Sequence, residues 1–350
     1  MKKLFCASLL LLSACAVAPE RPQGIAAIGD PVRPVPATVE TLVTTDATVD
    51  ADDPALWADP RDPSRAVMFA TDKTDGLYVH NLDGTVRQLL PDGPLNNVDL
   101  RDGFVINGKR QVLVAATERQ RFGIVVYLFD PDRFEIRRHG FIELGNEFGE
   151  PYGFCMGRQD EDFLLIPNNK QGEARIYRLE GGQPVSTVTL DRSVKVGGQT
   201  EGCVVDDERQ QLYLGEEDAA IWRFDLAKDA TNTPFLVAAV DNHRLTADVE
   251  GLTIMRDRGA SYLIASSQGD STFPIWRIAE DSYEYVGRFA VHGGNIDEVT
   301  ATDGLDAWSG PIGQFPEGAL AMHDDSDGAG QQNFKIVDWR EVQRHLTLAP

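Results

Sequence analysis

The sequence repeats at intervals of about fifty residues, and this repeat constrains the fold more than any other feature. Each unit begins with a polar residue that stands just before a short apolar run. These anchor residues lie 46 to 53 positions apart, and they are Asp53, Asp99, Tyr152, Glu201, Glu250 and Asp303. A repeat of this length indicates that each unit buries its apolar faces against its neighbours.

The apolar runs inside the units are short and strand-like. AVMFAT, QVLVAAT, IVVYLFD and YLIASS are examples, and Gly, Asp, Asn and Pro separate them. No long stretch has a helical period before EVQRHL near the C-terminus. About four strands in each of six units predict an all-β fold, a six-bladed β-propeller over residues 41–350. A two-sheet sandwich is the main competitor, but it does not account for the period.

The N-terminus is typical of an exported lipoprotein. MKKLFCASLLLLSACAVAPE has a basic start, a short apolar stretch and small residues before Cys15, which indicates a secretory signal and not a membrane span. LSAC resembles a lipobox, so we expect a signal peptide over 1–15 and lipidation at Cys15; cleavage near Ala16 or Ala18 without lipidation is the alternative. The proline-rich residues 16–40 predict a flexible tether. Because Ala16 follows the cysteine, we expect anchoring to the outer membrane.

Charge limits the possible partners. The chain has 55 acidic and 33 basic side chains, a net charge of −22, which repels nucleic acid and anionic membrane. Membrane attachment would therefore depend on the lipid alone, and we expect a monomer. A hydrophobic fraction of 42% is ordinary for a folded domain.

Two cysteines remain in the mature domain, Cys155 and Cys203. An exported protein can form a disulfide, but two cysteines are too few for a disulfide scaffold, and both lie in apolar contexts. We expect two free, buried thiols, with a bridge as the alternative.

A second position recurs in each unit, at the end of its second predicted strand. It lies 16 to 21 residues after the anchor and holds Lys73, Arg119, Lys170, Glu217, Gln268 and Asp324. Equivalent positions of successive blades form a ring around the axis of a propeller, so one half of this ring would be basic and the other acidic or neutral. The alternative is that these charges are solvated loop residues.

The acidic anchors indicate a bound cation. They precede glycine and buried apolar residues, as in TEGCVV and VEGLTI, and carboxylates clustered near a core raise one another's pKa unless a cation neutralises them. Oxygen ligands without histidine or cysteine favour calcium over zinc.

Several motifs together resemble the β-propeller phytases. They are DDPALW (52–57), NNVDLR (96–101), YGF (152–154), QTEG (199–202), GEEDAAIW (215–222), DVEGLT (248–253), ASSQG (265–269) and QNFKIV (332–337). The resemblance runs in register from about residue 45 to 340. It implies a six-bladed, calcium-dependent hydrolase that removes phosphate from myo-inositol hexakisphosphate, phytate.

The resemblance also implies roles for individual residues. Phosphate would bind Lys73, Arg119 and Lys170 beside Tyr152, and we add Arg101 as a substrate contact. The catalytic calcium ions would be held by Asp53, Glu201, Glu217, Asp248, Glu250, Asp297 and Asp303, with Gln268 as a further ligand. A structural calcium would bind Asp52 and the carbonyls of Pro54 and Val98. In the segment HDDSDG, Asp324 and Asp327 fall where the family has calcium ligands, although the surrounding residues differ.

No serine, cysteine or histidine is placed as a nucleophile, so we expect direct in-line attack on phytate or calcium phytate by calcium-bound water. RRHGFIE and the Cys203–Arg209 spacing superficially match other phosphatases. The first lacks the expected following arginine, which leaves His139 as a surface residue between strands, and the second has no glycine for a phosphate cradle. Two other functions remain open: a calcium-dependent propeller lactonase or esterase, and a non-catalytic binding lipoprotein.

Overall fold

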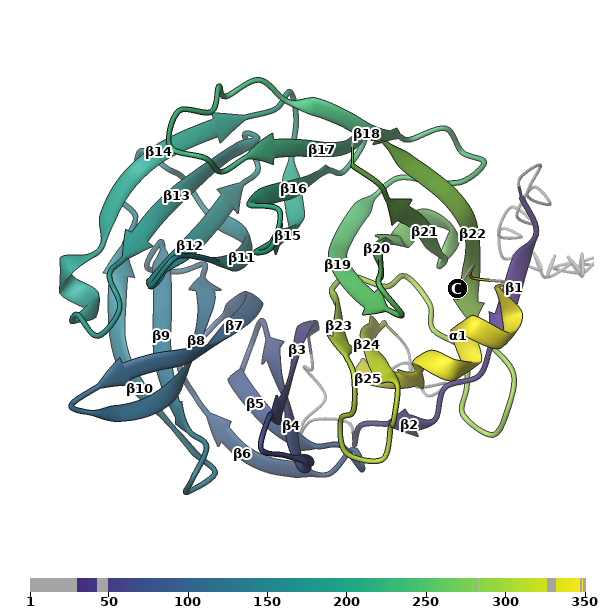
Figure 1. Cartoon of the computed structure of the whole chain (residues 1–350), viewed down its shortest axis with the longest axis horizontal. Helices are drawn as coiled ribbons and strands as arrows, with labels where there is room; N and C mark the ends of the chain where they lie inside the picture. Colours follow the sequence, from purple (N-terminus) through teal and green to yellow (C-terminus); the bar gives the residue numbers. More distant parts are fainter. Residues whose placement is uncertain (1–29, 43–49, 281, 326–331, 347, 349–350) are drawn as a thin grey trace, which may run out of the picture.

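Six small sheets are arranged in a ring around a central axis, so the chain is a six-bladed β-propeller (Figure 1). This is a computed structural model, and it describes residues 30–42, 50–280, 282–325, 332–346 and 348. The signal peptide, Cys15 and Asp327 lie outside the described residues. Within them, no helix has the length and apolar character that crossing a bilayer requires.

Each blade is built from consecutive antiparallel strands that run outward from the axis. The innermost strands are β3 (Ala51–Asp59), β7 (Leu95–Ile106), β11 (Pro151–Gln159), β15 (Thr200–Asp206), β19 (Val249–Asp257) and β23 (Leu305–Ser309). The second strands are β4 (Asp62–Asp72), β8 (Lys109–Glu118), β12 (Asp162–Asn169), β16 (Gln211–Glu216), β20 (Ala260–Ser267) and β24 (Gly318–Asp324). The third strands are β5 (Gly76–Asn81), β9 (Gly123–Asp130), β13 (Glu173–Leu179), β17 (Ala220–Asp225), β21 (Phe273–Ile278) and β25 (Asn333–Asp338).

The outer strands show how the ring closes. Five blades end in a strand that follows in sequence: β6 (Val86–Leu90), β10 (Glu135–Glu143), β14 (Thr189–Lys195), β18 (Phe235–Ala239) and β22 (Tyr283–Val291). The sixth takes its outer strand, β2 (Val39–Glu40), from the N-terminus, where Val39 pairs with Ile336 of β25. Both ends of the domain therefore contribute to one blade.

The predicted tether is wrong over its last residues. β1 (Val32–Val35) adds a fifth strand to the fifth blade by pairing in parallel with β22, and β2 closes the ring. Pro34 is tolerated within β1 because this strand lies at the edge of its sheet. The folded domain therefore includes residues 32–40.

The core consists of six apolar clusters that lie between neighbouring blades. Between the first two blades, for example, Trp57 packs edge-on against Phe129 with ring centroids 5.0 Å apart. Among the described residues, helical structure consists of α1 (Trp339–His345), as EVQRHL predicts, and two 3₁₀ turns at Val185–Thr187 and Gln268–Asp270. Asp338 caps α1 by accepting a hydrogen bond from the Arg340 backbone.

The expectation of two free thiols is wrong. Cys155 on β11 and Cys203 on β15 form a disulfide with an S–S distance of 2.07 Å and a Cα–Cα distance of 5.6 Å. The two innermost strands are neighbours, and their cysteines follow the anchors Tyr152 and Glu201 at nearly the same distance, so the ring geometry brings the sulfurs together. The bridge also removes Cys203 from any role as a nucleophile.

His139 lies inside strand β10 and is partly buried, so its predicted place at the surface between strands is wrong. Its ring lies 6.5 Å from the ring of Phe104. The arginine of the other rejected phosphatase motif, Arg209, forms an ion pair with Asp206.

Candidate active site

The recurring polar residues converge at one end of the central channel. Strand pairing begins in the same way in five blades, for example where Thr200 pairs with Glu216 and Val249 pairs with Ser267. In each of these five blades, the residue that follows each of the two paired residues occupies an equivalent position. The inner ring, at the start of the innermost strands of these five blades, is Asp52, Asn96, Tyr152, Glu201 and Glu250. In the sixth blade Asp303, two residues before β23, completes the ring, since its carboxylate lies beside Lys73 of the first blade. The outer ring, just after the second strands, is Lys73, Arg119, Lys170, Glu217, Gln268 and Asp325.

This register corrects three predicted positions. Asp52 and Asn96, and not Asp53 and Asp99, belong to the inner ring, and Asp325, and not Asp324, belongs to the outer ring. The two rings are tied together by backbone hydrogen bonds. In four blades, the backbone N–H of the outer-ring residue donates to a backbone carbonyl. This carbonyl belongs to the residue two positions before the inner-ring residue: Lys73 donates to Asp50, Arg119 to Pro94, Glu217 to Gln199 and Gln268 to Asp248.

Glycine allows the inner ring to be this narrow. A glycine follows Tyr152, Glu201, Glu250 and Asp303 in turn. A Cβ on Gly153 would lie 1.8 Å from the Glu201 carbonyl oxygen, and one on Gly202 would lie 2.2 Å from the Glu250 carbonyl oxygen. No side chain fits at these positions, so adjacent innermost strands approach closely and bring their carboxylates together.

Three carboxylates form a compact acidic cluster. Oxygens of Glu201, Glu217 and Glu250 all lie within 4.8 Å of one another, and each residue is at most 6% exposed. Within the described part of the chain, Glu217 Oε1 and Glu250 Oε2 are buried without a hydrogen-bond partner. Asn96 Nδ2 donates a hydrogen bond to Glu201 Oε1 at 2.8 Å.

The acidic cluster resists ionisation when no cation is bound. Burial and then repulsion from Asp52 raise the pKa of Glu201 to about 8. Burial raises the pKa of Glu217 to about 7, with further repulsion from Asp248. Burial and the charge of Glu201 raise the pKa of Glu250 well above its ordinary value. A bound hard cation would give the unpaired oxygens a partner and would neutralise the repulsion between the carboxylates. This set of donors therefore fits calcium.

Lys73 connects the acidic residues of the first and sixth blades. Its Nζ lies 2.7 Å from Asp52 Oδ1 and 3.2 Å from Asp303 Oδ2. Burial alone would lower the pKa of Lys73, but attraction to these two carboxylates raises it. The side chain is therefore a cation at neutral pH.

The other two predicted phosphate ligands flank Tyr152. The Arg119 guanidinium lies 5.6 Å from the centroid of the Tyr152 ring, and Lys170 Nζ lies 4.4 Å from it. Both cations also contact Glu150, at 2.5 Å from Arg119 and 3.6 Å from Lys170. The predicted basic half of the site is thus assembled, together with a carboxylate that was not predicted.

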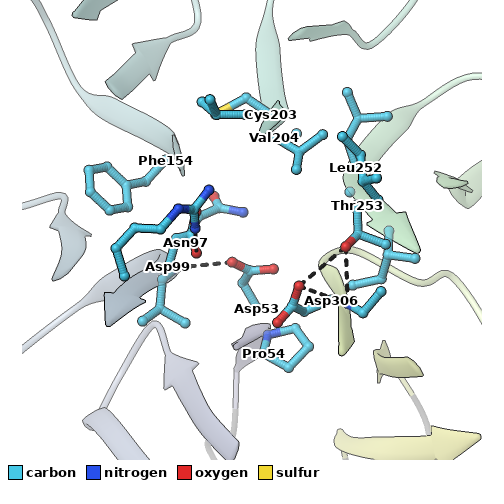
Figure 2. A pocket seen from close by; sticks show the side chains of 18 of the residues that line it. Asp53, Pro54, Asn97, Asp99, Phe154, Cys203, Val204, Leu252, Thr253 and Asp306 are labelled. Atoms are coloured by element: carbon cyan, nitrogen blue, oxygen red, sulfur yellow. Dashed lines mark hydrogen bonds and ion pairs between the residues drawn. The ribbon is translucent and has the colours of Figure 1, made fainter. Parts of the chain in front are cut away.

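Below the inner ring the channel widens into a cavity of about 320 Å³ (Figure 2). Asp53, Pro54 and Val98 line it, and the Val98 N–H donates to Asp53 Oδ2 at 2.9 Å. Burial and repulsion from Asp52 raise the pKa of Asp53 well above its ordinary value. Our assignment of the two neighbouring aspartates is therefore reversed: Asp53 lies with Pro54 and Val98, while Asp52 lies beside Lys73 and the acidic cluster.

The predicted substrate contact of Arg101 is not supported by its position. Arg101 lines the channel cavity, and its guanidinium donates to Asp207 at 2.9 Å, to Asp99 at 3.0 Å and to the Met156 carbonyl. Its side chain is 18% exposed and its donors are used by the channel wall. We therefore assign Arg101 to the structure of the channel.

The remaining predicted ligands separate into two groups. Gln268 donates to Asp303, and Asp248 lies close enough to Glu217 to raise its pKa, so both border the acidic cluster. Asp297 and Asp324 instead surround the buried Lys335 ammonium, each at 2.8 Å.

Three positioning contacts had no signal in the sequence. Asn168 donates to the Glu201 carbonyl at 2.8 Å, and His323 Nδ1 accepts the Asp303 backbone N–H at 3.0 Å. Glu150 lies two residues before Tyr152. Only its contacts with Arg119 and Lys170 in the folded structure distinguish it from any other acidic residue in a loop.

The comparisons with known proteins agree with this geometry. Residues 3–350 match the family model described as Phytase. The chain is 34% identical over 333 residues to the 3-phytase of Bacillus subtilis (strain 168), and the match covers 90% of this chain and 86% of that protein. The chain therefore belongs to the phytase family and is an enzyme of that family.

Proposed function

We propose that this enzyme hydrolyses phytate to lower inositol phosphates with calcium bound at the acidic cluster. The observation that carries the proposal is the position of this cluster against the cations. Burial raises the pKa values of Glu201 and Glu217, and the charges of Lys73 and Lys170, respectively, offset part of this rise. Cations and carboxylates are therefore close enough to interact at one end of the channel.

Calcium, when bound, would neutralise the cluster and supply Lewis-acid activation of water and phosphate. Glu201, Glu217 and Glu250 would hold it, with Asp52, Asp303 and Asp248 nearby, and Asp53 with the Pro54 and Val98 carbonyls offers a second set of oxygens in the channel. Without such neutralisation, an enzyme with a net charge of −22 would repel a substrate that carries several phosphates.

The chain's own cations would then act on the substrate. Lys73, Arg119 and Lys170 would bind the phosphoryl oxygens and stabilise the charge that develops on them during in-line attack by water on phosphorus. Arg119 and Lys170 both lie close to the Tyr152 ring, which would position them through cation–π contacts. The P–O bond breaks, and the inositol oxygen leaves with a proton.

The decisive assay is phosphate release from phytate in calcium, in excess chelator, and after calcium is restored. We expect release in calcium, loss in chelator and recovery on restoration. Release that persists in chelator would contradict the role of calcium. Absence of release at every calcium concentration, combined with hydrolysis of lactones or esters, would favour the propeller lactonases instead.

We also propose that the protein is exported and anchored, as a monomer, to the outer membrane through lipid on Cys15. Two acyl chains give stable attachment where one does not. The Cys15→Ser variant should move from the membrane fraction to the soluble fraction of cells, whereas wild type stays with the membrane. A variant that still sediments with membranes would refute lipidation.

A further inference from the structure

Glu150 occupies the position between two of the phosphate-binding cations. Its Oε1 accepts a hydrogen bond from Arg119 Nε at 2.6 Å and lies 3.6 Å from Lys170 Nζ. The three side chains come from different segments: Glu150 from the loop before β11, Arg119 from the turn after β8 and Lys170 from the turn after β12. This contact across two blades holds both cations at one carboxylate oxygen.

Calcium would not release this contact. Lys73 also has carboxylate partners, but these are Asp52 and Asp303, which lie beside the acidic cluster where a metal ion would neutralise them. Glu150 is not part of that cluster. Arg119 and Lys170 therefore keep a competing anion until another anion replaces it.

The geometry makes this replacement feasible. Arg119, Lys170 and Glu150 are 28%, 34% and 33% exposed, so the carboxylate can turn into solvent without leaving a buried charge. A phosphoryl group has several charged oxygens and can accept from both cations at short range. Glu150 offers the two cations one oxygen, and its contact with Lys170 is long.

We propose that Glu150 is an internal competitor of phosphate: it neutralises Arg119 and Lys170 in the free enzyme, is displaced by a substrate phosphoryl group, and returns to help expel the phosphate product. This inference rests on the proposed function of Arg119 and Lys170 as phosphate ligands. It makes Glu150 a determinant of specificity, since displacing it favours phosphoryl groups with the highest charge and disfavours singly charged anions.

The test compares Glu150→Gln with wild type by titrating the whole protein with inorganic phosphate, in chelator, and measuring the heat of binding. Glutamine keeps the shape of the side chain and removes its charge. We expect the Kd for phosphate to fall roughly three- to fivefold, the upper end of the range for a partly exposed ion pair. This measurement does not require turnover. The proposal for Glu150 can therefore fail although phytate hydrolysis is confirmed, or hold although hydrolysis is not observed.

Glu147→Gln is the matched control. Glu147 is in the same loop, is 71% exposed and pairs with Arg175, so its substitution changes the net charge equally without touching the two cations. It should leave the Kd within about twofold of wild type. Glu150→Ala, checked by its melting curve, should shift the Kd in the same direction as Glu150→Gln. An unchanged or larger Kd in both Glu150 variants, or an equal decrease of the Kd in the Glu147 control, would overturn the proposal.

Discussion

The Glu201→Gln variant is expected to lose phytate hydrolysis at low calcium and to recover part of it as calcium is raised. Glutamine preserves the hydrogen bond from Asn96 and the packing of β15 but removes one of the three charges of the acidic cluster. Several kcal/mol of charge stabilisation come from a catalytic metal ion, so we expect a loss of about a hundredfold or more at limiting calcium. The measurement is initial phosphate release over a calcium titration.

A substitution in the basic half of the site should lower activity in a way that calcium does not rescue. Arg119→Ala removes a charge-assisted contact to a phosphoryl oxygen, about 1.5–3 kcal/mol, or roughly ten- to a hundredfold in kcat/KM, and added calcium should not restore it. Glu216→Gln serves as a control for the acidic half, because Glu216 precedes Glu217 but hydrogen-bonds to Trp222. If calcium rescues both halves alike, or if both variants keep wild-type rates, the division of the site into metal and phosphate ligands is wrong.

Removal of calcium is expected to destabilise the fold, and more strongly at high pH. The metal-free protein holds Glu201 and Glu217 with pKa values of about 8 and 7, above the ordinary value of 4.5. Between pH 4.5 and 8 the folded state then binds more protons than the unfolded state, so the free energy of unfolding falls as pH rises. In chelator, the melting temperature should decrease from pH 5 to pH 8.

Calcium should reverse this trend, because it binds the deprotonated carboxylates. A concentration about a thousandfold above the Kd of one site adds about 4 kcal/mol, which raises the melting temperature of a propeller of this size by roughly 6 °C. The gain should be larger at pH 8 than at pH 5. Melting curves that are the same with calcium and with chelator at pH 8 would contradict a stabilising role for the metal.

The repeat made the fold predictable. A period near fifty residues with a polar residue before each innermost strand specifies six equivalent blades, and the glycines after Tyr152, Glu201, Glu250 and Asp303 explain why their strands pack so closely. The same repeat correctly placed most charged residues of the two rings. Local sequence could not show that the N-terminal β2 completes the last blade, because that pairing spans almost the whole chain.

The errors within the site have a common physical cause. Asp52 and Asp53 are adjacent on β3, and consecutive side chains of a strand point to opposite sides, so a one-residue error in alignment exchanges their surroundings. The disulfide, the contact of Glu150 with Arg119 and the Lys335–Asp297 ion pair all join residues of different blades or of distant segments. Such pairs depend on how blades are placed beside one another, and only the folded structure specifies this.

The most direct test of the account is a crystal structure of the enzyme grown with calcium and inorganic phosphate. We expect calcium at 2.3–2.6 Å from carboxylate oxygens of Glu201, Glu217 and Glu250, the usual range for this ion, and phosphate in contact with Lys73, Arg119 and Lys170. Calcium bound only elsewhere, with Lys73 still paired to Asp52 and phosphate absent from all three cations, would contradict it.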